Sequence, residues 1–185
     1  MAKTRIHFGY LCTVIAIIGM GVLIAKAQDE LKPRCAVKAG DTAPAFQAKA
    51  LDGTAINFPG DFKNKVVLID FWATWCPDCR EEMPNVIAAY KKYQPQGFEI
   101  IGVSLDETNK AAVLKQFVTE HHMAWPEIYD GGYWEAAIAT QYGVRETPCP
   151  VLVDGNTGKV IAMGEDVLGK ELPKALKSAL QKNQK

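Results

Sequence analysis

Two cysteines separated by two residues are the part of this sequence best suited to chemistry. Cys76 and Cys79 bracket Pro77 and Asp78, so a helix starting here brings both sulfurs to one face, within reach of a disulfide. Pro77 fits the first turn of a helix, where its missing N–H costs nothing. A helix N-terminus carries a partial positive charge, which favours the thiolate that attacks disulfides. We therefore expect a redox-active disulfide, with Cys76 as the exposed attacking thiol and Cys79 as the resolving thiol.

The residues around this pair indicate the direction of electron transfer, and they also weigh against the main alternative, a zinc site. Asp78 works against thiolate formation, and a less stabilised dithiolate favours a reductant over a strong oxidant. Structural zinc needs a second ligand pair at finger or ribbon spacing. The remaining candidates, Cys35, Cys149 and the adjacent His121 and His122, do not have that spacing. The pattern therefore favours redox chemistry, and no metal is expected.

The elements that must position the cysteines are a buried strand and a helix. Residues 66–72 form an apolar run broken only by Asp70, which is typical of a strand buried on both faces. A helix is predicted from residue 77 to about 93, with Pro84 inside it removing one hydrogen bond. The chain therefore predicts strand, turn and helix, with a cysteine where the helix begins.

The rest of the chain predicts an α/β fold in one domain. The predicted elements are a hairpin at 48–51 and 54–58, a strand at 98–105, a helix at 109–122, a strand at 126–129, a helix at 133–142, a hairpin at 151–153 and 160–163, and a helix at 171–181. Strands alternating with helices imply a parallel βαβ unit. The length of 185 residues, 48% of them apolar, suits one core, and zero net charge speaks against nucleic-acid binding.

The N-terminus has the pattern of an export signal. Residues 8–25 are uncharged and mostly apolar, and Lys3 and Arg5 precede them. Residues 25–27, Ala-Lys-Ala, fit a small-x-small cleavage site, although the apolar run also approaches the length of a membrane span. We expect residues 1–27 to be a signal peptide or membrane anchor, with cleavage favoured, 28–40 a linker and 41–183 the folded domain. In either case the domain lies outside the cytoplasm.

The segment 71–84, FWATWCPDCREEMP, resembles the active site of the TlpA/ResA branch of thioredoxin-like proteins, and the similarity extends from about Gly40 to the C-terminal helix. The resemblance implies a thioredoxin-like fold, a central mixed β-sheet flanked by helices, with an N-terminal hairpin and an extra strand and helix element within 106–142. It implies a thiol-disulfide oxidoreductase without a cofactor, periplasmic or at the outer face of the cytoplasmic membrane, touching the membrane only through its N-terminal segment. Its partners would be disulfide-containing exported proteins and a membrane electron donor of the thiol-disulfide type.

Residues 142–154 match the family's cis-proline segment without gaps. On that match Pro148 is the cis-proline packed against the cysteines, and Thr147 exposes backbone on which an extended substrate can pair as an added strand. Trp75 and Pro77 complete the substrate-binding residues that we expect. Glu82 matches the family's glutamate near the active-site helix, where it could relay a proton to or from Cys79 as a catalytic residue.

The same segment departs from the family pattern at two positions. Cys149 stands where threonine or a similar polar residue is usual, and Pro150 puts the register of the following strand in doubt. Cys149 could be an inert core residue, a third thiol near Cys76, or the partner of Cys35 in a second disulfide. The spacing does not choose among these alternatives.

Three functions compete on these grounds. The first is a reductant of disulfides in exported proteins, for example in cytochrome c maturation or metal-site assembly. The second is a copper-binding carrier that uses the same two cysteines with Met123 or Cys149. The third is a thiol peroxidase, which needs a proline and a threonine ahead of the reactive cysteine, where Ile69 and Ala73 stand instead.

Overall fold

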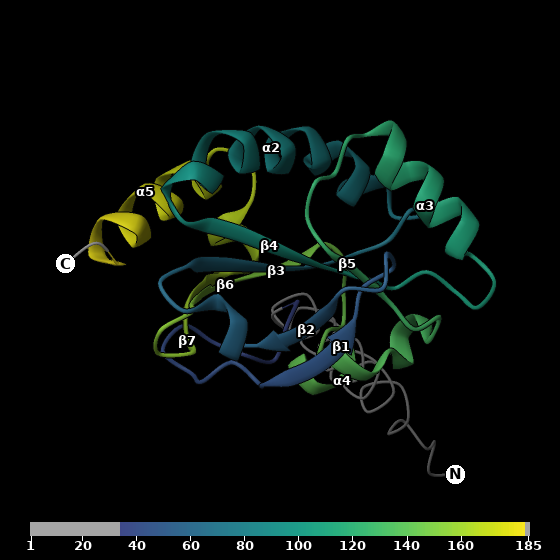
Figure 1. The fold of residues 1–185 in the computed structure, drawn as a ribbon, viewed down its shortest axis with the longest axis horizontal. Coiled ribbons are helices and arrows are strands. Elements are labelled where there is room, and N and C mark those ends of the chain that lie inside the picture. The colour runs from purple at the N-terminus through teal and green to yellow at the C-terminus, as the bar shows by residue number, and fades with distance from the viewer. Residues whose placement is uncertain (1–33, 184–185) are drawn as a thin grey trace, which may run out of the picture. The chain divides into compact units, whose positions relative to one another are not determined.

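The computed structural model describes residues 34–183 and builds them around a mixed five-stranded sheet. Along the sheet the strands follow the order β5-β4-β3-β6-β7 (Figure 1). Their bounds are Val66–Trp72 for β3, Phe98–Ser104 for β4, Glu127–Tyr129 for β5, Cys149–Asp154 for β6 and Lys159–Met163 for β7. β3, β4 and β5 run parallel, whereas β6 and β7 pair antiparallel, so the predicted βαβ unit and the mixed sheet are both present.

Helices and a small hairpin cover the two faces of the sheet. The helices are α2 at Pro77–Tyr93, α3 at Ala111–Glu120, α4 at Ala137–Tyr142 and α5 at Glu171–Asn183; the 3-10 helices are η1 at Gly60–Phe62, η2 at Gln94–Gln96, η3 at Tyr133–Glu135 and η4 at Gly164–Val167; the hairpin strands are β1 at Phe46–Lys49 and β2 at Ala55–Phe58. Figure 1 shows α2 and α5 on one side of the sheet, and α4 and the hairpin on the other.

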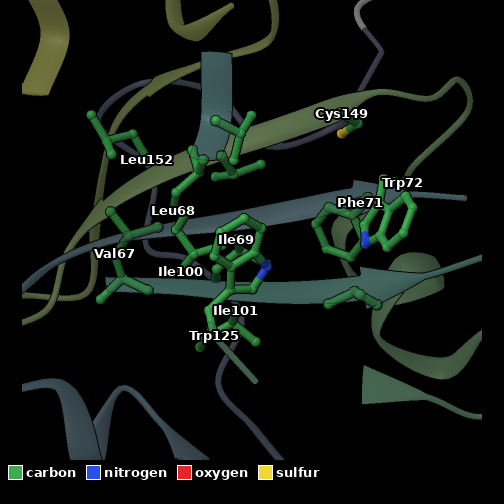
Figure 2. Close-up of a cluster of buried hydrophobic side chains, with 14 of the residues drawn as sticks. Val67, Leu68, Ile69, Phe71, Trp72, Ile100, Ile101, Trp125, Cys149 and Leu152 are labelled. Carbon is green, nitrogen blue, oxygen red and sulfur yellow. The ribbon is translucent and has the colours of Figure 1, made fainter. Parts of the chain in front are cut away.

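Strand β3 forms the centre of the core, as its apolar sequence predicts. All seven of its residues are buried, and Figure 2 shows Val67, Leu68 and Ile69 of β3 near Ile100 and Ile101 of β4 and Leu152 of β6. Successive side chains of a strand point to opposite faces. Phe71 accordingly contacts Tyr142 of α4, with ring centroids 5.1 Å apart, and Trp72 contacts Phe117 of α3 at 5.2 Å on the opposite face. The strand that leads into the two cysteines is therefore held from both sides.

Helix α2 continues through Pro84, as the sequence predicts. Its buried side chains recur every three or four residues, which marks the face that packs on the sheet. These residues are Cys79, Met83, Val86, Ala89 and Tyr93. The resolving cysteine thus belongs to the stripe that anchors the helix to the core.

The prediction of one helix at 133–142 is wrong in one respect. The structure divides this segment into η3 and α4. Ala136 separates them with φ −50° and ψ 130°, a backbone conformation that cannot continue a helix. Tyr133, which opens η3, has a left-handed φ of 55°. The extra element after β4 therefore consists of α3, β5, a short turn of 3-10 helix and α4.

The doubt about strand register at Pro150 is not borne out. β3 and β6 pair without interruption from Phe71↔Cys149 to Val66↔Asp154, with Pro150 opposite Asp70. β7 pairs with β6 only from Val151 onward, so no strand lies beside Pro150 on its other side. Proline has no backbone N–H to donate. Because no strand lies beside Pro150 on the side away from β3, no hydrogen bond between strands is lost on that side. The irregularity in register lies instead between β6 and β7, at Leu152 and Val153.

The folded unit begins at Arg34, before the predicted boundary at residue 41. Cys35 and Val37 are buried, and the amide of Ala36 donates hydrogen bonds to the carbonyls of Tyr142 and Gly143. The end of the predicted linker is thus attached to the domain. The predicted signal peptide or anchor at 1–27 and the linker up to residue 33 lie outside the described residues. Among residues 34–183, no helix is both long and apolar enough to cross a membrane.

Candidate active site

The Cys76–Cys79 pair lies where α2 begins, as predicted, and its two sulfurs are bonded to each other. The Cα atoms are 5.3 Å apart. Cys76 is the N-cap of the helix, and its Sγ accepts a hydrogen bond from the amide of Cys79 at 3.1 Å. Negative charge on a sulfur in this position is stabilised by the helix N-terminus. This geometry gives Cys76 the place of the attacking thiolate.

Cys76 is not exposed in this disulfide-bonded state, contrary to the expectation from sequence. It retains 3% of its accessible surface and Cys79 retains 2%, so exposure does not distinguish the two residues. The Cys76 sulfur is bonded to the Cys79 sulfur and accepts a hydrogen bond from the Cys79 amide, so it lies against the first turn of α2. The distinction between attacking and resolving cysteine rests on the N-cap position alone.

The Thr147–Pro148 peptide bond is cis, as the family resemblance implies. Pro148 is buried and Thr147 is half-buried. Pro148 lines a groove together with Asp78, so the residue between the cysteines and the proline before Cys149 face the same space. Of the other expected substrate-binding residues, Trp75 and Pro77 are exposed on either side of Cys76.

The groove beside the disulfide has a volume of about 440 Å³ and an acidic lining, and we call it the acidic groove. Its lining residues are Arg34, Asp78, Glu81, Glu82, Asn85, Pro148, Glu165, Leu168 and Gly169. Arg34 is the one basic residue among them, and it is paired with Glu165 at 3.0 Å and with Glu146 at 3.7 Å. The remaining carboxylates leave the groove with excess negative charge.

Glu82 is half-buried in this groove, held by two hydrogen bonds. Its Oε1 accepts from the amide of Gly169 at 2.7 Å, and its Oε2 accepts from Nδ2 of Asn85 at 3.1 Å. It lies three residues after Cys79, on the same helical side. The arrangement joins α2 to the turn after η4 and keeps a carboxylate close to the resolving cysteine.

The sequence patterns did not predict a role for two buried carboxyl groups, those of Asp70 and Glu127. Burial, with a smaller effect of Glu82, raises the pKa of Asp70 to about 7. Glu127 has 3% of its surface exposed. Burial raises its pKa to about 8, a hydrogen bond from Trp72 opposes the rise, and nearby Asp70 adds to it. In the sequence, Asp70 could have been recognised as unusual because it is the one ionisable residue in the apolar run of β3.

The second pair of cysteines, Cys35 and Cys149, is bonded in the structure across 114 residues of sequence. Both residues are completely buried. Of the three alternatives for Cys149, this arrangement corresponds to the disulfide with Cys35. Because Cys149 directly follows Pro148, the bond ties the segment around Cys35 to the loop that borders the acidic groove.

The copper-carrier alternative names Met123 or Cys149 beside the two redox cysteines. Met123 is buried, and the imidazole of the neighbouring His121 packs on Phe117 with ring centres 4.1 Å apart. Within residues 34–183, no three His, Cys, Asp or Glu side chains are grouped so as to hold a metal ion.

Comparison with known proteins is consistent with this site. The AhpC/TSA family matches residues 39–163. The thiol-disulfide oxidoreductase ResA of Bacillus thuringiensis subsp. konkukian is 32% identical over 182 residues, covering 98% of each chain, and that of Bacillus anthracis is 33% identical with the same coverage.

Solved structures give the same result for the fold. The thioredoxin domain of a thiol-disulfide oxidoreductase from Bacteroides vulgatus superposes with a TM-score of 0.68 at 28% identity, covering 78% of this chain and 99% of that one. A thiol:disulfide interchange protein from Bacteroides sp. reaches 0.66 at 27% identity, covering 78% and 91%. The fold is therefore thioredoxin-like, with an N-terminal hairpin, as the resemblance implies.

Proposed function

The chain belongs to the AhpC/TSA family and is a ResA-like thiol-disulfide oxidoreductase, and on that premise we propose that it reduces disulfide bonds of exported proteins outside the cytoplasm. The observation that carries the proposal is a Cys76–Cys79 disulfide at the N-cap of α2, bordered by the acidic groove of about 440 Å³.

In the proposed reaction the reduced protein gives two electrons to the substrate. The Cys76 thiolate attacks one sulfur of the substrate disulfide, which forms a mixed disulfide and releases the other substrate sulfur as a thiolate. The Cys79 thiolate then attacks the Cys76 sulfur. That step forms the Cys76–Cys79 bond and releases the second substrate cysteine as a thiolate, which takes up a proton.

Cys79 must lose its proton before the second step, and two carboxyl groups are available to accept it. Asp70 is buried in β3, and its burial, with a smaller effect of Glu82 of α2, raises its pKa to about 7, which suits a base near neutral pH. Glu82 lies one helical turn beyond Cys79. We assign the proton to Asp70, because both oxygens of Glu82 already accept hydrogen bonds.

The direction towards reduction is supported by the charges at the site. Asp78, Glu81 and Glu82 line the groove next to the cysteines and oppose the formation of thiolates there. A protein whose dithiol form is not specially stabilised donates electrons readily. We expect the Cys76–Cys79 pair to have a reduction potential near that of thioredoxin, about −270 mV, whereas a value near −120 mV would reverse the assignment.

The proposed place of action is the periplasm or the outer face of the cytoplasmic membrane. The Cys35–Cys149 disulfide supports it, because structural disulfides persist in oxidising compartments. Electrons would come from a membrane thiol-disulfide protein, and the substrates would include proteins of cytochrome c maturation or metal-site assembly. Labelling of intact cells with a membrane-impermeant thiol reagent tests this, since a protein that reacts only after lysis would contradict it.

The proposed reaction is tested with the variants Cys76→Ser and Cys79→Ser. We expect both to lose catalysed disulfide reduction, and Cys79→Ser to accumulate a covalent mixed disulfide with its substrate, visible on a non-reducing gel. Retention of the parent rate by either variant would refute the mechanism. Tight Cu(I) binding without disulfide exchange would favour the copper carrier instead.

A further inference from the structure

Two exposed aromatic side chains and a half-buried third form a cluster at the residue that precedes the redox-active cysteine. Trp75 precedes Cys76 and is 42% exposed, and its ring lies 5.4 Å from that of Tyr133 and 5.8 Å from that of Trp134. Tyr133 is itself 36% exposed. We call Trp75, Tyr133 and Trp134 the aromatic shelf. Of the three large apolar side chains exposed within residues 34–183, two belong to it, and Val113 is the third.

The shelf is held in place. The indole nitrogen of Trp75 donates to the carbonyl of Leu105 at 3.3 Å, which fixes this ring to the loop after β4. Gly132, which precedes Tyr133, forms a bridge with Glu107 in the same loop. Tyr133 adopts a left-handed φ of 55°, which is costly for a bulky residue and recurs where a side chain must be presented in one position. The rings of Trp75 and Tyr133 are thus presented to solvent, and the half-buried Trp134 packs beside them.

The acidic groove borders the same cysteine pair. Its lining includes Asp78, which follows Cys76 in the sequence, whereas Trp75 of the aromatic shelf precedes Cys76. The groove also includes Pro148, whose neighbour Thr147 offers backbone to an extended strand. Among its lining residues only Arg34 is basic, and Arg34 is already paired with Glu165 and Glu146. A polypeptide that brings a cysteine to Cys76 therefore meets aromatic rings at Trp75 and negative charge at Asp78.

We propose that the aromatic shelf and the acidic groove select the substrate: an extended polypeptide whose disulfide cysteine has an aromatic side chain on one flank and a lysine or arginine on the other. The inference rests on the proposed function, because it concerns the polypeptide that this disulfide reductase accepts. The aromatic flank of the substrate would stack on the rings of the aromatic shelf. The lysine or arginine flank would be attracted and oriented by the carboxylates of the acidic groove.

The test uses eight short peptides, each with one cysteine joined in a mixed disulfide to thionitrobenzoate. Their flanks are aromatic and lysine, aromatic and glutamate, alanine and lysine, or alanine and glutamate, made in both orders. Cys76 attacks the peptide sulfur and releases coloured thionitrobenzoate, and Cys79 then frees the peptide thiol. Ellman's reagent, which has no peptide flanks, reports disulfide exchange itself.

We expect the largest second-order rate constant, measured in a single turnover of the previously reduced protein, for an aromatic–lysine peptide. An aromatic flank should gain about threefold to tenfold over alanine, and lysine about threefold over glutamate at low salt, the latter shrinking as salt is added. Tyr133→Ala and Trp134→Ala should reduce the aromatic preference, and Tyr133→Phe should retain it. Glu81→Gln and Glu165→Gln should reduce the lysine preference.

The controls are Val113→Ala and Glu120→Gln, an exposed apolar residue and an exposed acidic residue on α3, outside the shelf and the groove. Both should leave all the rates unchanged. Equal rates on all peptides, with Ellman's reagent reduced normally, would overturn this inference and leave the proposed function intact. Failure to reduce Ellman's reagent and every peptide would instead overturn the proposed function.

Discussion

The side chain of Glu127 accepts a hydrogen bond from the indole nitrogen of Trp72, 2.9 Å from its Oε2, in the interior of the domain. Its other oxygen, Oε1, is buried and has no hydrogen-bond partner among the described residues. Glu127 lies opposite Gly102 of β4 in the parallel pair, where a Cβ would overlap its carboxyl group. The Glu127 carboxyl group thus fills the space that the absent side chain of Gly102 leaves open.

Glu127 makes the domain less stable as the pH rises. Its folded pKa of about 8 lies above the ordinary value of 4.5, so between these values the unfolded chain loses a proton that the folded protein keeps. Such a group lowers the free energy of unfolding by about 1.4 kcal/mol per pH unit across that window. We expect Glu127→Gln to flatten the dependence in denaturant titrations from pH 5 to pH 8. The exposed Glu120→Gln should not, and an unchanged slope in Glu127→Gln would contradict the assignment.

The close fit between Gly102 and Glu127 predicts strong coupling between the two positions. Gly102→Ala should destabilise the protein by about 1–3 kcal/mol, because the added methyl group meets the carboxyl group in a packed interior. In Glu127→Ala the same methyl group finds room, so the double variant should be less destabilised than the sum of the two single variants. Urea unfolding of the four proteins measures this coupling. Simple additivity would mean that the two side chains do not share the space.

Asp70 predicts a pH dependence of the resolving step. In the proposed mechanism the ionised carboxylate accepts the Cys79 proton, so the rate of dithiol oxidation should rise through about pH 7, the pKa of Asp70. Asp70→Asn should abolish this rise and slow the step by about tenfold to a hundredfold. Stopped-flow fluorescence, with Trp75 next to Cys76 as the reporter, can follow it. If Glu82→Gln removes the rise and Asp70→Asn does not, the proton goes to Glu82.

The Cys35–Cys149 bond predicts a large contribution to stability. It closes a loop with a sequence separation of 114, and in the chain-entropy model such a bond stabilises by roughly 4–5 kcal/mol. Replacing both cysteines by alanine should lower the denaturation midpoint accordingly, with Cys76 and Cys79 still able to exchange. Peptide mapping without reduction should recover a fragment that joins Cys35 to Cys149. Free thiols at both positions would eliminate the bond.

The parts of the site that could be predicted from the sequence are those made by neighbours in the chain. The apolar run of β3, the proline at the start of α2 and the two-residue spacing of the cysteines are local features, and a local pattern carries their structure. The division of the predicted helix at Ala136 was missed, because one extended residue leaves little trace in a periodic pattern.

By itself the sequence determined the strand, the helix and the chemistry at its N-terminus, because these depend on residues a few positions apart. Only the tertiary structure decided that Cys35 meets Cys149, that Arg34 lines the groove and that Cys76 is covered while it is bonded to Cys79. It also decided the states of Asp70 and Glu127, since a carboxyl group changes its pKa through the water removed from around it. That removal depends on which distant segments pack over the residue, and no local pattern records it.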